Sequence, residues 1–385
     1  MRFETTKQQK NMRDDVRGFI ERYSQRDYQR ELDKKELFPH DLWDKLADMG
    51  LFGLGIDEKY GGSGGDITDM VIAVEELARE MFVLGDIYAQ FNCFGPTVIK
   101  SFGNEEQKKN FLPKLAKGQL RICLGITDGH SGIDALALKT TTEENSGDFS
   151  IKGQKMFVAG AQVSDYVILM TRTTWNLSKK SNGISIFMVD LKTPGITIKR
   201  ISKLGIKAID SCELLFDNVR VPRENLLGQK DYGWYQILEV LNYKRIIIAA
   251  LCVGCAQAAF EDAVQYAKTR VIFSRPIGQY QAIQDYISDM YVKIESARLM
   301  IKKAAWLQMN NQTCFIESNM AKLAASEAAV SATSKGMQIM AGYGFMMEHD
   351  MQGYWRDSKL FGFAPVTNEM VCNFLTERLG LPRSY

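Results

Sequence analysis

The sequence predicts an α+β protein in three consecutive parts: an N-terminal helical domain (residues 1–120), a middle β-barrel or β-sandwich domain (121–228) and a C-terminal helical bundle (229–385). Apolar residues recur at helical spacing in the first and last parts, whereas the middle part has short apolar runs separated by turn residues. Because helices and strands do not alternate, no doubly wound nucleotide-binding sheet is expected.

Apolar spacing and a stop signal predict the N-terminal helices. Leu42, Leu46 and Met49 fall at positions i, i+4 and i+7, and Gly50 follows as a natural helix end. Further helices are expected at residues 68–81 and 105–117.

The middle part has the pattern of a β-domain. Runs at 166–170 and 184–189 are apolar and bounded by turn residues at 182–183 and 193–195. From about residue 229 the chain is rich in Ala, Met, Gln and Lys, with few Pro or Gly breaks before Gly342, which favours long helices.

Composition argues against several classes of function. With 48 Lys and Arg against 46 Asp and Glu, the net charge of +2 lacks the basic excess of a nucleic-acid-binding protein. The sequence contains no run of about 18 apolar residues, so no membrane span is expected. The seven scattered cysteines fit a reducing, cytoplasmic location. Cys252 and Cys255 have no second ligand pair, so we expect core packing and no metal site.

Short segments distributed over almost the whole chain carry the family signal. In order they are 58–62, 102–108, 125–134, 153–158, 215–228, Arg270 with Phe273, 280–284, 338–344 and Arg356 with Asp357. Together and in register, these segments resemble the acyl-CoA dehydrogenase family. The resemblance implies an N-terminal helical domain, a middle β-domain and a C-terminal four-helix bundle, assembled as a homo-oligomer, either a dimer or a tetramer.

The same resemblance implies that the cofactor is FAD. The flavin ring would lie against the middle domain, at Ile126, Thr127, Phe157, Val158 and Ala159. The rest of the dinucleotide would be held, partly from a neighbouring subunit, by Arg270, Phe273, Gln281, Gln338, Gly342, Thr367 and Glu369. Two positions depart from the family pattern: Ile133 replaces a serine that commonly bonds the pyrophosphate, and Ala159 replaces a threonine or serine near the flavin.

The residue expected to act as catalytic base is missing. Acyl-CoA dehydrogenation removes a proton from Cα of the acyl group, so a carboxylate must lie beside that carbon. The resemblance places this base at Pro365 or, in some relatives, at Lys244, immediately before Arg245. Proline is no base, and it lacks the N–H that helps to polarise the thioester carbonyl. Glu369 is the carboxylate nearest to this loop and the remaining candidate, although its position in the family usually faces the adenosine.

We therefore expect an FAD-dependent oxidoreductase that acts on an acyl thioester, carried by CoA or by an acyl carrier protein, with atypical chemistry. One such reaction is oxidation of a β-hydroxyl group, whose proton leaves from oxygen. Lys244, Arg245, Gln90 and Asn92 are the candidate substrate-binding residues. Reduction of an enoyl thioester is a variant, and a non-catalytic subunit that completes the flavin site of an active paralogue is the alternative. For a dehydrogenase, the resemblance implies an electron-transfer flavoprotein as acceptor.

Overall fold

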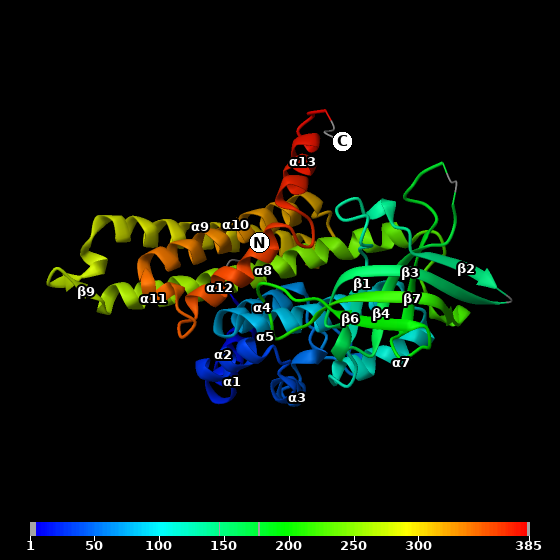
Figure 1. Ribbon diagram of the computed structural model, residues 1–385, viewed down its shortest axis with the longest axis horizontal. Coiled ribbons are helices and arrows are strands. Elements are labelled where there is room, and N and C mark those ends of the chain that lie inside the picture. The colour runs from blue at the N-terminus through cyan, green and yellow to red at the C-terminus, as the bar shows by residue number, and fades with distance from the viewer. Residues whose placement is uncertain (1–4, 146, 176–177, 383–385) are drawn as a thin grey trace.

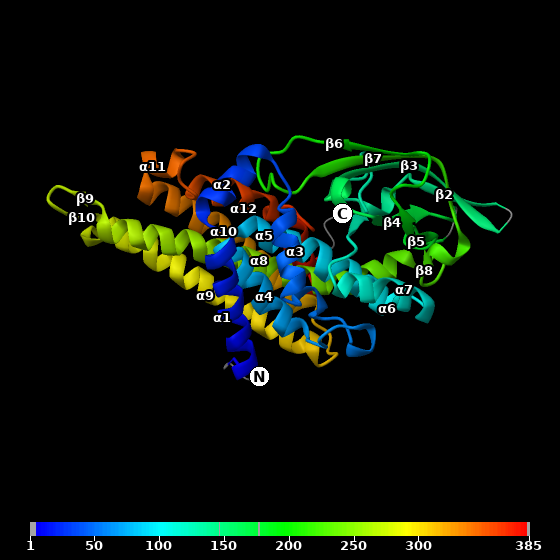
Figure 2. The same ribbon diagram turned by 90° about the horizontal axis from the view of Figure 1, so that it is seen from below.

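The computed structural model describes residues 5–145, 147–175 and 178–382. Three long helices, α8 (Gly233–Thr269), α9 (Gln281–Met309) and α10 (Phe315–Met340), run side by side along the length of the molecule (Figure 1). The sheet lies at one end of these helices, and the N-terminal helices pack along one side of them (Figure 2). The predicted order of helices, sheet and helices is confirmed.

The N-terminal part is helical, as its apolar spacing predicts. Its helices are α1 (Lys7–Tyr23), α2 (Arg26–Lys35), α3 (His40–Asp48), α4 (Ile67–Glu80), α5 (Phe82–Tyr88), the π-helical turn η3 (Ala89–Phe94), α6 (Gly95–Phe102) and α7 (Glu105–Ala116). Thr6, Asp66 and Asn104 cap α1, α4 and α7 with reciprocal capping boxes, in which the side chain three residues later bonds back to the cap. These local bonds fix where α1, α4 and α7 begin.

The middle part forms an eight-stranded sheet in the order β6-β7-β3-β2-β4-β5-β8, with β1 paired to β4. The strands are β1 (Ile122–Gly125), β2 (Thr141–Asn145), β3 (Asp148–Ala159), β4 (Tyr166–Arg172), β5 (Ile184–Asp190), β6 (Ile196–Arg200), β7 (Ser211–Val221) and β8 (Leu226–Leu227). The register of β3 against β7 shifts between Lys155 and Val158. Phe157, inside this shift, adopts a φ of 60°, so the strand bulges at this point.

Helix α8 is the centre of the C-terminal part. By length and composition it is the one helix among the described residues that could cross a membrane, but 78% of its most apolar stretch is buried within the protein. It packs against α4, α9 and α10. We conclude that α8 is a core helix of the fold.

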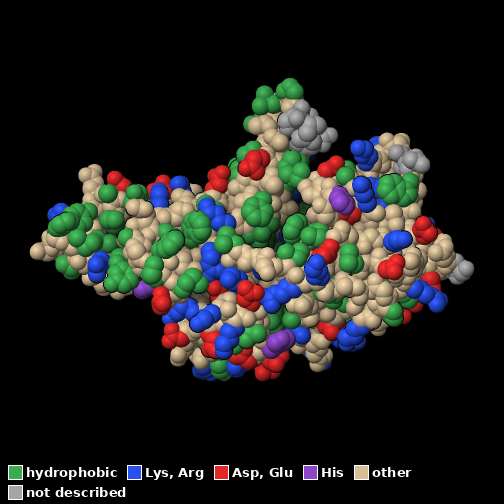
Figure 3. Space-filling view, in the orientation of Figure 1, with side chains coloured by type: hydrophobic (Ala, Val, Ile, Leu, Met, Phe, Trp, Pro, Cys, Tyr) green, Lys and Arg blue, Asp and Glu red, His purple; other side chains and the backbone are tan. Residues whose placement is uncertain are grey.

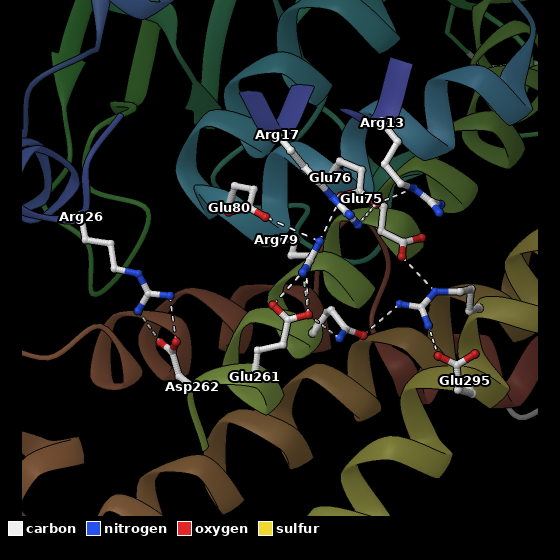
Figure 4. A network of polar contacts seen from close by, with 12 residues as sticks. Arg13, Arg17, Arg26, Glu75, Glu76, Arg79, Glu80, Glu261, Asp262 and Glu295 are labelled. Carbon is white, nitrogen blue, oxygen red and sulfur yellow. Dashed lines mark hydrogen bonds and ion pairs between the residues drawn. The ribbon is translucent and has the colours of Figure 1, made fainter. Parts of the chain in front are cut away.

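A network of arginines and glutamates joins the N-terminal helices to the bundle (Figure 4). Glu76 on α4 accepts a hydrogen bond from Arg17 of α1 at 2.8 Å, and Glu75 accepts one from Arg298 of α9 at 2.9 Å. Arg79 on α4 pairs with Glu261 on α8 at 2.8 Å. Because burial of an unpaired carboxylate is costly, these pairs fix the position of α4 against α1, α8 and α9.

A short hairpin and three further helices complete the C-terminal part. Helix α12 (Met351–Ser358) packs against α10 and α8, after the short hairpin strands β9 (Val271–Ile272) and β10 (Arg275–Pro276) and the one-turn α11 (Gly342–Phe345). Helix α13 (Asn368–Arg378) projects from the body of the molecule (Figure 1). Val371 is its one buried residue, most of its other residues are half-buried, and the Phe374 ring lies 6.0 Å from that of Phe315 at the start of α10, so α13 packs only partly against the bundle.

Candidate active site

The loop between α12 and α13 carries the position where the family places its base. Pro365 is half-buried and follows a cis peptide bond. Lys322 on α10 is fully buried, and its Nζ donates to the Val366 carbonyl at 2.7 Å and to Asn368 Oδ1 at 2.6 Å. Burial lowers the pKa of Lys322 to about 8. The loop is therefore held to the bundle by charge-assisted hydrogen bonds, with a proline where a carboxylate is usual.

Thr367 and Glu369 lie where this loop becomes α13. The Thr367 hydroxyl accepts a hydrogen bond from the Met370 amide at 3.2 Å and caps the helix. Glu369 is exposed in the first turn. The structure thus assigns Thr367 a capping role of its own and leaves the Glu369 carboxylate at the surface of this chain.

The second base position, Lys244, lies on α8 with its side chain half-buried. Its Nζ lies 4.3 Å from the centroid of the Phe94 ring, and among the described residues no carboxylate lies within the 4.0 Å limit of an ion pair. Burial lowers the pKa of Lys244 to about 8, and the charge of Asp86 opposes this effect. The N–H donors of the Lys244 ammonium group therefore have no acidic partner in direct contact within the described part of the chain.

Arg245, the next residue, is buried. Its Nη1 donates to Asn242 Oδ1 at 3.0 Å, and its guanidinium carbon lies 5.5 Å from the centroid of the Phe315 ring. Its Nε has no hydrogen-bond partner. Burial lowers the pKa of Arg245 to about 10. Together with Lys244 it places two basic groups inside the molecule on one turn of α8.

Gln90 and Asn92 lie on the π-helical turn η3, which contacts α8. Asn92 is buried, and its Nδ2 has no hydrogen-bond partner. Gln90 is half-buried, lies one helical turn after Asp86 and helps to lower the pKa of that carboxyl group. Because π-helical turns are frequent at functional sites, both residues remain candidates for substrate binding.

Asp86 on α5 is the charged residue of this region that sequence reasoning missed. It is 2% exposed, and its Oδ1 has no hydrogen-bond partner within residues 5–145, 147–175 and 178–382. Burial raises its pKa to about 6, against the lowering effects of Lys203, Gln90 and Lys244. A lone acidic residue within the apolar stretch 82–89 was the signal that could have identified it.

The expected flavin face of the middle domain is partly open. Ile126 and Thr127 follow β1 and are half-buried, and the Thr127 carbonyl accepts the Met156 amide at 2.8 Å. Phe157 is 67% exposed. Val158 buries its side chain within the sheet core, so it offers only backbone groups to a ligand. Ala159 is half-buried.

A buried ion pair holds together the two segments that form the expected flavin face. Lys155 and Asp128 meet at 2.5 Å, and both are buried. Lys155 also donates to the Ile126 carbonyl at 3.0 Å, while Asp128 accepts the Thr140 amide at 2.7 Å. These bonds hold the loop after β1 against β3, which fixes Thr127 relative to Phe157.

Five of the residues expected to hold the rest of the dinucleotide, Arg270, Phe273, Gln281, Gln338 and Gly342, lie at the far end of the bundle, whereas Thr367 and Glu369 lie apart from them at the start of α13. A hollow at the far end of the bundle is lined by Tyr266, Arg270, Ile272, Ile277, Ile339, Met340, Ala341, Gly342, Tyr343 and Met346. Arg270 forms no ion pair among the described residues, and its guanidinium carbon lies 5.5 Å from the centroid of the Tyr343 ring. Phe273 is 88% exposed, and Gln281 and Gln338 are exposed as well. Hydrophobic side chains cover much of this end of the molecule (Figure 3).

These surfaces fit the parts of FAD. A free arginine fork suits a phosphate, and exposed aromatic rings suit a planar ring system. The two sets lie at opposite ends of the molecule, with the sheet at one end and β9 at the other (Figure 1). Helix α8 alone, with 37 residues, is about 55 Å long. One FAD therefore cannot contact both sets within a single chain.

Three family models together match almost the whole chain. They are the N-terminal domain of acyl-CoA dehydrogenase at residues 6–119, the middle domain at 123–219 and the C-terminal domain at 231–380. Each covers one of the three structural parts, helices, sheet and helices.

Individual relatives agree with these models. The chain is 38% identical over 371 residues to a probable acyl-CoA dehydrogenase, YngJ, of Bacillus subtilis, covering 96% of this chain and 97% of the relative. It is 32% identical over 366 residues to the CarC subunit of the caffeyl-CoA reductase–Etf complex of Acetobacterium woodii, covering 95% and 96%. The solved structure of the prolyl acyl carrier protein oxidase AnaB superposes with a TM-score of 0.93 at 28% identity and covers 98% of this chain and 100% of that one. With its fold and its full length matched, the chain belongs to the acyl-CoA dehydrogenase family.

Proposed function

We propose that this protein oxidises a hydroxyl group on the β-carbon of an acyl thioester. It is an oxidoreductase of a family of FAD flavoproteins, so FAD is its cofactor. When bound, FAD supplies a two-electron acceptor that takes a hydride from a carbon atom of the substrate.

One observation carries the proposal: neither family base position has an acid. Pro365 occupies the loop position, and Lys244, with a free ammonium group, occupies the position on α8. Removal of a proton from Cα requires a base within hydrogen-bond reach. Oxidation of an alcohol removes its proton from oxygen instead, and that proton is far more acidic than one on Cα. A site without the usual base is therefore better matched to an alcohol than to a saturated acyl chain.

The residues around this position are suited to a polar acyl group. Lys244 has ammonium donors to offer, Asn92 has an amide without a hydrogen-bond partner, and Gln90 lies half-buried on the adjoining turn. A saturated hydrocarbon would leave these groups without hydrogen bonds, at a cost of about 1–3 kcal/mol for each buried group. We infer that the polar lining selects against simple fatty acyl chains.

We also propose the assembly and the partners. The two sets of FAD-fitting residues lie too far apart for one chain, so the cofactor site is completed by a second copy in a homodimer or homotetramer. The relative CarC belongs to a complex with Etf, which supports an electron-transfer flavoprotein as acceptor. Similarity to a prolyl acyl carrier protein oxidase supports an acyl carrier protein as well as CoA as the thioester carrier. All seven cysteines are free thiols, in keeping with a cytoplasmic location.

Anaerobic bleaching of the flavin tests the reaction. The FAD-loaded protein is mixed with β-hydroxybutyryl thioester or with butyryl thioester, each on CoA and on a phosphopantetheinylated carrier protein. We expect loss of the yellow colour and formation of a β-keto thioester from the hydroxyl substrate alone. Bleaching by butyryl thioester, with formation of an enoyl product, would contradict the proposal and restore ordinary dehydrogenation.

A non-catalytic role is the second candidate, and Pro365 is the observation that favours it. Without an N–H at this position, one donor to the thioester carbonyl is missing, and the loss of one such donor costs about 3 kcal/mol of transition-state stabilisation. Under this reading the purified protein stays colourless, or becomes yellow only with a catalytic paralogue. A yellow protein that reacts by itself excludes this reading.

A further inference from the structure

Asp86 is a buried carboxylate near the candidate active site with an open hydrogen-bond acceptor. It is 2% exposed, and its Oδ1 accepts no hydrogen bond. Buried carboxylates are ordinarily paired or fully hydrogen-bonded. The open acceptor on Asp86 is therefore a feature that the fold alone does not explain.

Charged and polar groups from three elements surround this carboxylate. Helix α5 packs against both η3 and α8. Gln90 on η3 and Lys244 and Cys252 on α8 are near enough for their pKa values or that of Asp86 to be affected. Lys203, in the loop between β6 and β7, faces it from the middle domain. Two ammonium groups thus lie near Asp86, yet neither forms an ion pair with it within 4.0 Å. The cluster lies where the N-terminal helices, the sheet domain and the bundle meet.

The hydrogen-bond inventory of this cluster indicates the kind of ligand that completes it. Asp86 offers an unused acceptor, and Lys244 offers unused donors. A hydroxyl group donates one hydrogen bond and accepts others, so it can satisfy both at once. A carboxylate on the ligand could accept from Lys244 but would repel ionised Asp86, and a methyl group could satisfy neither.

We propose that Asp86 and Lys244 hold the hydroxyl group of the acyl substrate between them, and that the Asp86 carboxylate receives the hydroxyl proton during oxidation. This inference rests on the proposed function and supplies the base that the family positions lack. Lys244 donates to the substrate oxygen and keeps it oriented, and Gln90 orients the Asp86 carboxylate.

The step balances as an alcohol oxidation. The O–H bond breaks and its proton passes to Asp86, while the carbinol C–H bond breaks and its hydride leaves to the bound oxidised flavin. The remaining electrons form the C=O bond of the β-keto thioester. The substrate loses two electrons and two hydrogens, and the proton on Asp86 returns to solvent before the next turnover.

The protonation states needed for this step coexist near neutral pH. Asp86 must be ionised to accept, and burial raises its pKa to about 6. Lys244 must be protonated to donate, and burial lowers its pKa to about 8. The rate of oxidation should therefore rise with pH as Asp86 loses its proton and fall as Lys244 loses its own.

The test compares Asp86→Asn and Lys244→Gln with Asp357→Asn. Asp357 is a matched control because it is another buried carboxylate, whose Oδ1 accepts the Ile206 amide at 2.6 Å, and because an asparagine can accept the same bond. Flavin bleaching by β-hydroxybutyryl thioester is followed from pH 5 to 9, and binding of butyryl and β-hydroxybutyryl thioesters is measured by titration calorimetry on the FAD-loaded proteins. Far-UV circular dichroism and flavin content verify folding.

We expect Asp86→Asn to slow bleaching by about 10²- to 10⁴-fold, as removal of a general base does, and to abolish the acid limb of the pH profile. Lys244→Gln should abolish the alkaline limb and reduce the preference for the hydroxyl thioester by about 10-fold. Butyryl thioester should bind all variants alike, and Asp357→Asn should keep both limbs.

The failure of this assignment is distinguishable from failure of the proposed function. If the unmodified protein oxidises the alcohol and Asp86→Asn retains its rate and acid limb, the Asp86 assignment is overturned and the proposed function stands. If the unmodified protein neither oxidises nor prefers the hydroxyl thioester, both are overturned. If the Asp86→Asn variant misfolds, the Lys244→Gln variant decides. A Lys244→Gln protein that keeps the alkaline limb of the pH profile and the preference for the hydroxyl thioester would equally overturn the assignment.

Discussion

Two neighbouring helices bury acidic side chains in opposite ways. On α4, Glu75 and Glu76 accept hydrogen bonds from Arg298 and Arg17, in the network of Figure 4. On α5, which begins two residues after α4 ends, Asp86 has an open acceptor and forms no ion pair with any residue that the structure describes. The two glutamates on α4 thus have arginine partners within the chain, and these pairs join helices. The group on α5 is incomplete, as expected where a ligand supplies the missing bond.

The basic side chains repeat this contrast. Lys322 is fully buried and donates to two oxygen atoms of the loop that carries Pro365. Lys244 contacts the Phe94 ring and has no acidic partner within ion-pair distance. Burial lowers both pKa values to about 8, so a lowered pKa does not separate a structural lysine from a ligand-binding one. The two lysines are instead distinguished by their hydrogen-bond partners within the chain.

The largest effect should come from breaking one of the glutamate–arginine pairs of α4. Arg298→Met leaves Glu75 buried without its partner on α9, since the 2.9 Å bond is lost. We expect a decrease of about 4 kcal/mol in the free energy of unfolding, the usual cost of leaving one member of a buried pair. Urea denaturation followed by far-UV circular dichroism measures it.

A control follows from the same network. The double variant Arg298→Met with Glu75→Gln removes the uncompensated charge and should recover a large part of the loss. A single variant as stable as the unmodified protein would show that Glu75 is not held by this pair, and the contrast with Asp86 would then be lost.

The next largest effect should have the opposite sign. Burial raises the pKa of Asp86 from 3.8 to about 6, so the folded state binds a proton that the unfolded state releases between these pH values. The contribution of Asp86 to stability is therefore fully present below pH 3.8 and is lost as the pH rises through about 6. A rise of this size corresponds to about 3 kcal/mol.

Asp86→Asn should accordingly be more stable than the unmodified protein above pH 6, with a gap that closes toward pH 4. Urea denaturation at several pH values, with protein concentration held constant, measures this gap. An Asp86→Asn variant that is less stable than the unmodified protein at pH 8 would show that the Asp86 carboxylate is stabilised by partners in the folded chain. Asp86 would then be a structural carboxylate like Glu75 and Glu76.

The same contrast explains what the sequence could predict. Fold class followed from periodicity, because Leu42 and Leu46 lie on the buried face of α3 and the strands at 166–172 and 184–190 are built around short apolar runs. Family motifs indicated the base position at Pro365. Asp86 belongs to no motif, and its importance depends on which side chains face it from α8 and from the loop between β6 and β7. Contacts between distant segments are what local sequence patterns do not encode.

A smaller effect should separate the two lysines. Lys322→Met removes the charge-assisted hydrogen bonds to Val366 and Asn368, and we expect a loss of about 2 kcal/mol in unfolding free energy. Lys244→Met should be neutral or stabilising, because it removes a half-buried charge that has no acidic partner in direct contact among the described residues. Urea denaturation at pH 7 compares the two variants. Equal losses would indicate that Lys244 is bound within the chain.

The smallest effect concerns Thr367, which caps α13 and is also expected to contact FAD. Thr367→Ala removes the acceptor of the Met370 amide, and loss of an N-cap costs about 1 kcal/mol. Thr367→Ser keeps the cap and is the matched control. If Thr367 only caps the helix, the serine variant matches the unmodified protein in both unfolding free energy and FAD affinity. If its methyl group also packs against the cofactor, the serine variant keeps its stability without FAD and loses FAD affinity, which fluorescence titration measures. Helix α13 projects from the body of the molecule, with Val371 as its one buried residue. For either Thr367 variant, oligomer assembly should therefore change the affinity for FAD far more than it changes the free energy of unfolding.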